Sequence, residues 1–168
     1  CYDDLAVLAY DNAGASARRT LMLVVGEGCP QKPYGGSPIT IPGKFEAEHF
    51  DEGWREEAYH DLEKANQGGQ LRPDSGVDIG ARDGTTYVGW TEPGEWIEYE
   101  VNVKEDGDYR IKSRVAAGTV GGTMVVSDTG RGESVSATVS PTGDWHNFEM
   151  IEFPERLSLE EGTTVLRL

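Results

Sequence analysis

Polar and apolar positions alternate most regularly between residues 96 and 103. Every second residue from Ile97 to Val103 falls on one face of an extended chain, whereas Trp96 falls on the other face with carboxylates and an amide. The aliphatic face predicts the core side of a β-strand, so the tryptophan lies on the polar side. A tryptophan beside such polar groups suits stacking on a sugar ring, and a partly covered packing side chain is the alternative.

Short strand-like runs, separated by turn residues, continue along the chain from residue 44 to its last residue. None of them has helical periodicity over three turns, and their spacing is typical of an antiparallel β-sandwich with Greek-key or jelly-roll connections. We therefore predict an all-β fold. The predicted strands are residues 44–50, 77–79, 86–90, 96–103, 107–116, 123–127, 134–139, 145–153 and 163–168.

The N-terminal part of the chain has a separate organisation. Residues 5–10 and 20–25 read as two strands joined by a turn-rich connection, and this hairpin resembles the last two strands of a bacterial immunoglobulin-like module. Residues 27–38 are dense in Gly, Pro and Ser, which marks a linker. The expected organisation is thus an immunoglobulin-like fragment at 1–26, a linker at 27–38 and a β-sandwich at 39–168.

The net charge limits which ligands the chain can bind, and the cysteines bear on its cellular compartment. The 168 residues include 30 acidic and 15 basic side chains and carry a formal charge of −15, which would repel nucleic acid and anionic membranes and favours a neutral ligand. No run approaches the roughly 20 apolar residues of a spanning helix. Cys1 and Cys29 either form a disulfide, which indicates an extracytoplasmic setting, or are free thiols that say nothing of the compartment.

Five motifs follow one another in order within residues 39–168: IPGKFEAEHFD, AYHDLEKANQGGQLRPDSGVDI, VGWTEPGEWIEYEVNV, DGDYRIKSRVA and TGDWHNFEM. Together they resemble the family 6 carbohydrate-binding modules. The resemblance implies a β-sandwich without catalytic activity that directs an attached glycoside hydrolase to its polysaccharide.

The resemblance also implies where a sugar binds. Trp90 and Trp145 match two aromatic positions that face each other across a loop site. Tyr59, His60 and Asp61 are candidates for a polar partner in that site. In related modules an asparagine from a closing strand completes it. The sequence stops at Leu168 before such a strand, so we expect either that the strand lies beyond Leu168 or that the module is incomplete.

A second sugar site and a metal site are the other expectations. Trp96 matches a stacking platform that some members of the family carry on the concave sheet face. Glu46 and Glu48, two residues apart on a predicted strand, share one face and suit Ca2+, which prefers carboxylate oxygens. The spacing alone is a weak signal, but the resemblance implies a structural calcium at this Glu-x-Glu.

Two other classes of function compete with a binding module. A glycosidase could use Glu46 with Glu48, or Glu95 with Glu98, but retaining enzymes hold their two carboxyls about 5–5.5 Å apart across a cleft and raise the pKa of one. An adhesion or spacer module fits the acidic sandwich. We expect a secreted, monomeric module, tethered to a catalytic domain, that binds a neutral β-linked polysaccharide such as agarose, xylan or a β-glucan.

Overall fold

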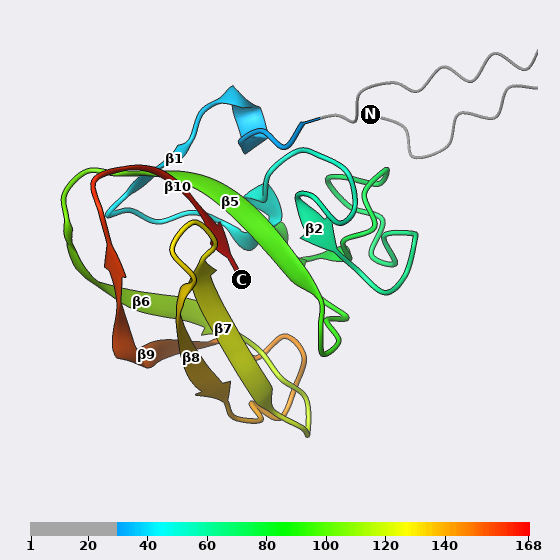
Figure 1. Cartoon of the computed structure of the whole chain (residues 1–168). Coiled ribbons are helices and arrows are strands. Elements are labelled where there is room, and N and C mark those ends of the chain that lie inside the picture. The colour runs from blue at the N-terminus through cyan, green and yellow to red at the C-terminus, as the bar shows by residue number, and fades with distance from the viewer. Residues whose placement is uncertain (1–29) are drawn as a thin grey trace, which may run out of the picture.

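Residues 30–168 are described by a computed structural model (Figure 1). The predicted hairpin, the immunoglobulin-like fragment and the cysteine pair lie outside this range. The described elements are the 3-10 turns η1 (Tyr34–Gly36) and η2 (Ala47–His49) and the strands β1 (Ile39–Ile41), β2 (Tyr59–His60), β3 (Ile79–Arg82), β4 (Thr85–Val88), β5 (Trp96–Val103), β6 (Gly107–Val115), β7 (Gly122–Asp128), β8 (Glu133–Val139), β9 (Glu149–Leu159) and β10 (Gly162–Arg167).

Strand β5 is the centre of the larger sheet, whose strand order is β1-β5-β10-β7-β8. One edge of β5 pairs with β1 and β2, and the other pairs antiparallel with β10, which lies beside it in Figure 1. The alternation predicted from the sequence is confirmed, because Tyr99, Val101 and Val103 are at most 1% exposed. Trp96, on the opposite face, is only partly buried.

Strands β6 and β9 form an antiparallel pair of their own, separate from the larger sheet. Phe153, Leu157 and Leu159 of β9 join the same buried cluster as the apolar face of β5, so the two sheets share one core. On the outer face, Glu152 pairs with Arg110 at 3.2 Å and with Lys112 at 3.3 Å. The prediction of an all-β sandwich is confirmed.

A hairpin of β3 and β4 forms a further small sheet, in which the two strands pair only with each other. The turn between them is Asp83-Gly84, and its backbone φ angles of 52° and 78° are those of a type I′ turn. Gly80 lies opposite Tyr87, and a Cβ on this glycine would come within 2.7 Å of the Tyr87 ring. The absent side chain therefore lets the phenol ring lie across the hairpin.

Residues 44–50 were predicted as a strand, and the structure corrects this. Segment 47–49 is a 3-10 turn closed by a hydrogen bond from His49 N to Glu46 O, while β1 and β2 occupy the edge of β5 that such a strand would need. Glu46 and Glu48 therefore do not share a strand face. Glu46 is exposed and pairs with Lys44 at 3.0 Å, whereas Glu48 is 5% exposed and accepts a hydrogen bond from the Thr86 hydroxyl.

A buried carboxylate ties the N-terminal end of the described chain to the sheet. Asp51 is 1% exposed, and its Oδ2 accepts hydrogen bonds of 2.8 Å from Gln31 Nε2 and from the Glu100 amide. Burial raises the pKa of Asp51 despite these donors. Lys32 exchanges two backbone hydrogen bonds with Glu52, so part of the predicted linker lies against the sandwich.

The helical turns in residues 30–168 are three residues long, and neither can cross a membrane.

The shared core predicts a contrast between two positions on β9. Leu157→Ala should lower the free energy of unfolding by about 2–5 kcal/mol, because this side chain is 1% exposed and its loss leaves a cavity. The control is Met150→Ala, because Met150 is 64% exposed on the same strand and its loss should change stability by less than about 0.5 kcal/mol. Urea unfolding followed by circular dichroism measures both, and equal effects would contradict the assignment.

Candidate functional site

An open cleft of about 460 Å³ lies between the β3–β4 hairpin and the loop that joins β8 to β9. This volume falls within the range of small-ligand sites in proteins. The hairpin and the loop bring aromatic rings and charges of both signs to the cleft. It is lined by Arg82, Asp83, Thr85, Tyr87, Arg114, Asp144, His146, Asn147 and Phe148.

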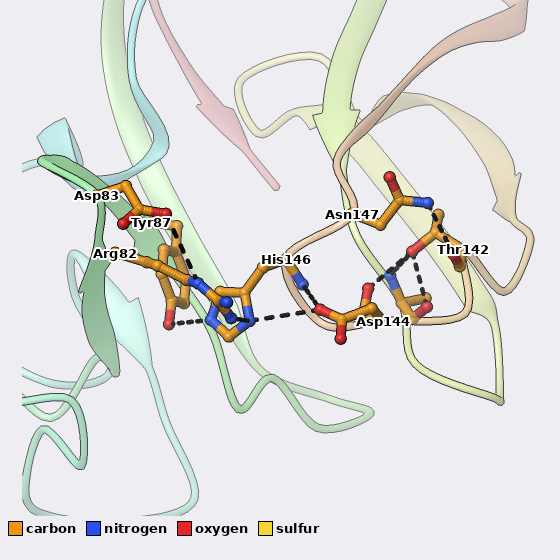
Figure 2. A network of polar contacts seen from close by, with 8 residues as sticks. Arg82, Asp83, Tyr87, Thr142, Asp144, His146 and Asn147 are labelled. Carbon is orange, nitrogen blue, oxygen red and sulfur yellow. Dashed lines mark hydrogen bonds and ion pairs between the residues drawn. The ribbon is translucent and has the colours of Figure 1, made fainter.

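Tyr87 and His146 join the two walls of the cleft, as Figure 2 shows. The Tyr87 hydroxyl lies 2.9 Å from His146 Nε2, and the two rings meet edge to face with centroids 5.4 Å apart. Phe148 packs against Tyr87 from the same loop at 5.9 Å. These contacts, one polar and two aromatic, help to hold the hairpin and the loop together.

The hydrogen bonds of His146 determine its tautomer. Arg82 Nη1 lies 2.7 Å from His146 Nδ1, and because arginine can only donate, Nδ1 must accept. The ring proton is therefore assigned to Nε2, which donates to the Tyr87 oxygen. The His146 amide also donates to Asp144 Oδ1 at 2.7 Å, so the side chain is fixed at both ends (Figure 2).

The loop carrying His146 is anchored at its start. The Thr142 amide donates to the Ala117 carbonyl at 2.8 Å, and the Thr142 hydroxyl accepts from the Ala117 amide at 3.0 Å. Asn147 Nδ2 closes the loop on the Thr142 carbonyl at 2.8 Å (Figure 2). Trp145 lies against Gly118 in this arrangement and is 67% exposed. The loop therefore presents an indole to solvent on a fixed backbone.

Trp90 is presented by the other wall. It follows β4 with a backbone φ of 52°, a left-handed conformation that costs a bulky residue about 1–3 kcal/mol and is concentrated at functional sites. Its ring lies 6.4 Å from Tyr87 and nearly parallel to it, and the residue is 51% exposed. Trp90 and Trp145 thus belong to the two elements that the contact of Tyr87 with His146 connects.

Trp96 has a different environment. The Arg167 guanidinium carbon lies 3.7 Å from the centre of the Trp96 ring, and Glu98 holds Arg167 through contacts of 2.8 and 2.7 Å. The His60 ring lies nearly parallel to the indole, 6.4 Å away. One ring face of this predicted platform is therefore covered by a cation. Trp96 is not among the residues that line the cleft, and neither are Trp90 and Trp145, which lie on the two elements that flank it.

The candidates for a polar partner do not lie together in the cleft. Tyr59 is 4% exposed and packs edge-on against Phe50, and Asp61 is 3% exposed, so neither side chain is presented to a sugar. His60 is partly exposed, but its Nδ1 lies 2.6 Å from Glu56 Oε1 and its ring faces Trp96. The two-residue strand β2 pairs with β5 here and turns its alternate side chains inward.

Tyr87, His146 and Phe148 were not predicted as site residues from the sequence. Each lies within three residues of a tryptophan that was predicted to bind sugar, and this proximity is the sequence signal that could have identified them. Their contacts join segments 59 residues apart, and no local pattern records such a contact.

The carboxylate pairs considered for glycosidase chemistry do not face a cleft. Glu98 is 4% exposed and bound to Arg167. Glu95 accepts hydrogen bonds from the Leu62 and Glu92 amides. The arrangement offers stacking and hydrogen bonding at an open cleft.

A β-sandwich that presents exposed indoles beside an open polar cleft defines the class of carbohydrate-binding domains. The model of the family "Carbohydrate binding module (family 6)" matches residues 46–168, and the chain belongs to this family. It is a non-catalytic binding module.

One curated relative is similar in sequence, and two solved structures share the fold. An alpha-agarase from Thalassotalea agarivorans is 26% identical over 115 residues, which span 67% of this chain but 8% of the agarase. A family 6 module from Clostridium stercorarium in complex with cellobiose has a TM-score of 0.57 and 16% identity, over 79% of this chain and 88% of that one. A family 43 arabinoxylan arabinofuranohydrolase from Bacillus subtilis, in complex with cellotetraose, has a TM-score of 0.52 and 23% identity, over 78% of this chain and 24% of that one.

The packing of the Trp145 ring against Gly118 can be tested without removing the indole. A Cβ at position 118 would lie 2.7 Å from the indole ring, so Gly118→Ala should displace this exposed side chain and shift its indole N–H signal in the NMR spectrum. Gly122→Ala is the matched control, because nothing lies within 4 Å of its Cβ position. An unchanged indole signal in Gly118→Ala would mean that the ring does not rest on Gly118.

Proposed function

We propose that this module binds a neutral β-linked polysaccharide at the cleft, with Trp90 and Trp145 as stacking surfaces, and so directs an attached glycoside hydrolase to its substrate. The observation that carries the proposal is the exposure of both indoles, 51% and 67%, on elements fixed by Tyr87 and His146. The agarase relative supports agarose as the ligand, and the relatives bound to cellobiose and cellotetraose support β-glucans.

The energetics favour stacking as the main source of affinity. A sugar that covers about 80 Å² of an indole gains about 2 kcal/mol at roughly 25 cal/mol per Å². The rings are already held in place, so little side-chain entropy is lost on binding. Two such indoles, at about 2 kcal/mol each, would make aromatic stacking the main source of the binding free energy.

The polar lining supports a neutral ligand. Arg82 and Arg114 are matched in the cleft by Asp83 and Asp144, so the cleft carries no excess of one charge in a chain with a net charge of −15. The exposed Asn147 adds a side-chain carbonyl that can accept a hydrogen bond from a hydroxyl. A polyanion would gain nothing at this cleft and would be repelled by the rest of the surface.

A second surface is formed on the sheet face by His60, Trp96 and Arg167. The indole there is partly exposed, and a ligand can stack on the ring face that Arg167 covers only if the guanidinium moves. We rank this surface below the cleft for that reason. An adhesion or spacer role without glycan binding is the remaining alternative.

The proposal includes a structural Ca2+ at Glu46 and Glu48. Glu48 fits this role, since it is a carboxylate 5% exposed that forms no ion pair with any described residue. Glu46 would have to exchange its surface pair with Lys44 for the metal. Bound calcium would supply positive charge that offsets the burial of Glu48.

The proposal places the module outside the cell, as a monomeric unit tethered to a catalytic domain. The chain spans 8% of the length of the agarase that it matches, which supports a module within a larger enzyme.

The first test is calorimetric titration of the chain with agaro-, xylo-, cello- and laminari-oligosaccharides. Trp145→Ala and Trp90→Ala should each weaken binding to one series by at least about tenfold, which corresponds to about 1.4 kcal/mol. Met150→Ala removes an exposed apolar side chain outside the cleft and should bind as the parent chain does.

The pattern of losses separates the alternatives. Binding that survives both substitutions but is lost in Trp96→Ala would place the site on the sheet face. Absence of binding to any of the four series would favour the spacer role.

The calcium site is tested by thermal unfolding with excess Ca2+ and with EDTA. The parent chain should unfold at a lower temperature in EDTA, because a cation that binds only the folded state stabilises it by about 2.7 kcal/mol at 100 times its Kd. Glu48→Gln keeps the acceptor for Thr86 but should reduce this difference, whereas the exposed Glu57→Gln should not. An equal calcium response in Glu48→Gln would exclude Glu48 as a ligand.

A further inference from the structure

Three carboxylates that the candidate sites do not use meet beside the start of β5. The pairing of β2 with β5 places His60 opposite Trp96, so that Asp61, which follows β2, lies next to Glu95, which precedes β5. Glu63 joins them from two residues further along the chain. One oxygen from each of the three carboxylates lies within 4.8 Å of the others.

The carboxylates of this cluster form no ion pair with any residue in 30–168, although one guanidinium lies close to their backbone. No described lysine, arginine or histidine forms an ion pair with Asp61, Glu63 or Glu95. Arg55 is close, but its guanidinium donates to the backbone carbonyls of Asp61 and Glu63. Desolvation, followed by the charges of Glu95, Asp78 and Glu63, raises the pKa of Asp61 to about 6.

One oxygen of the cluster lacks the partner that its burial demands. Asp61 is 3% exposed, and among the described residues only its Oδ1 receives a hydrogen bond, from the Glu63 amide. Glu63 Oε2 is enclosed and has no hydrogen-bond partner among the described residues. A buried carboxylate oxygen without a donor is strongly unfavourable, so this atom indicates a ligand with positive charge.

We propose that Asp61, Glu63 and Glu95 bind a divalent cation of the calcium type. Oxygens that share one Ca2+ at about 2.4 Å lie at most about 4.8 Å apart, and the three oxygens of this cluster lie within 4.8 Å of one another. The set contains no histidine or cysteine, which disfavours zinc. Glu63 and Glu95 are only partly buried, so water can complete a shell of six to eight oxygens.

This site is separate from the Glu-x-Glu site and has a different effect. Glu95 ends the turn between Trp90 and Trp96, and its two oxygens already bind the Leu62 and Glu92 amides. A cation shared with Asp61 and Glu63 would fasten this turn to the chain after β2. The metal would then hold in place the segment that connects the two tryptophans.

The test is calorimetric titration of the whole chain, stripped with EDTA, with CaCl2 and separately with MgCl2. The Glu48→Gln background isolates the cluster from the other proposed calcium site. In this background we expect one Ca2+ to remain bound. Glu63→Gln should weaken the affinity for this Ca2+ by more than about tenfold, because losing even a residue that only supports a metal ligand costs at least that much. Glu92→Gln, an exposed residue on the same turn, is the matched control.

The melting temperature in EDTA shows whether the Glu63→Gln chain is still folded. Glu63 Oε2 has no hydrogen bond to lose, and removing one of three like charges should leave the melting temperature unchanged or raise it. The calcium-induced rise in melting temperature should then disappear in the Glu63→Gln chain with the Glu48→Gln background. Calcium binding that is equal in Glu63→Gln and Glu92→Gln, or no binding in the Glu48→Gln background, would overturn the proposal.

Discussion

The need to satisfy the backbone of β5 on both edges organises the rest of the structure. Its N-terminal half pairs with β2 and its C-terminal half with β1 on one edge, while β10 covers the other edge. A central strand with both edges paired has no free donors or acceptors to expose, and its apolar face is available for the core. The position of β2 follows from this pairing, and with it the meeting of Asp61 and Glu95.

The face of β5 away from the core carries polar groups whose burial needs partners. Arg167 neutralises Glu98 from β10 and lies over Trp96. Asp51 Oδ2 accepts from Gln31 and from the Glu100 amide, which join the start of the described chain to β5. Such networks give little net stability but are strongly unfavourable when one member is missing, so they restrict the sheet to one register.

Sequence reasoning succeeded where a single strand contains the signal. The alternation of residues 96–103 predicted β5 and the side on which Trp96 lies, and both are confirmed. It failed where pairing with a neighbouring strand decides the local structure. Residues 44–50 alternate like a strand, yet β1 and β2 occupy the edge that they would need, and β9 begins at Glu149 because residues 145–148 form the cleft loop. Strand β2 has only two residues, which is too short to show the alternation of polar and apolar positions typical of a strand. The burial of Tyr59 and Asp61 could therefore not be predicted from the sequence.

The hairpin of β3 and β4 hydrogen-bonds to no other named strand. One wall of the cleft is therefore attached to the sandwich through loops and side chains, while the opposite wall is an anchored loop. A change at Tyr87 or His146 can alter the spacing of the walls without changing the register of any sheet. In evolutionary terms, the width of the cleft and the stability of the scaffold can vary independently, which lets one sandwich acquire new ligand preferences by a few substitutions.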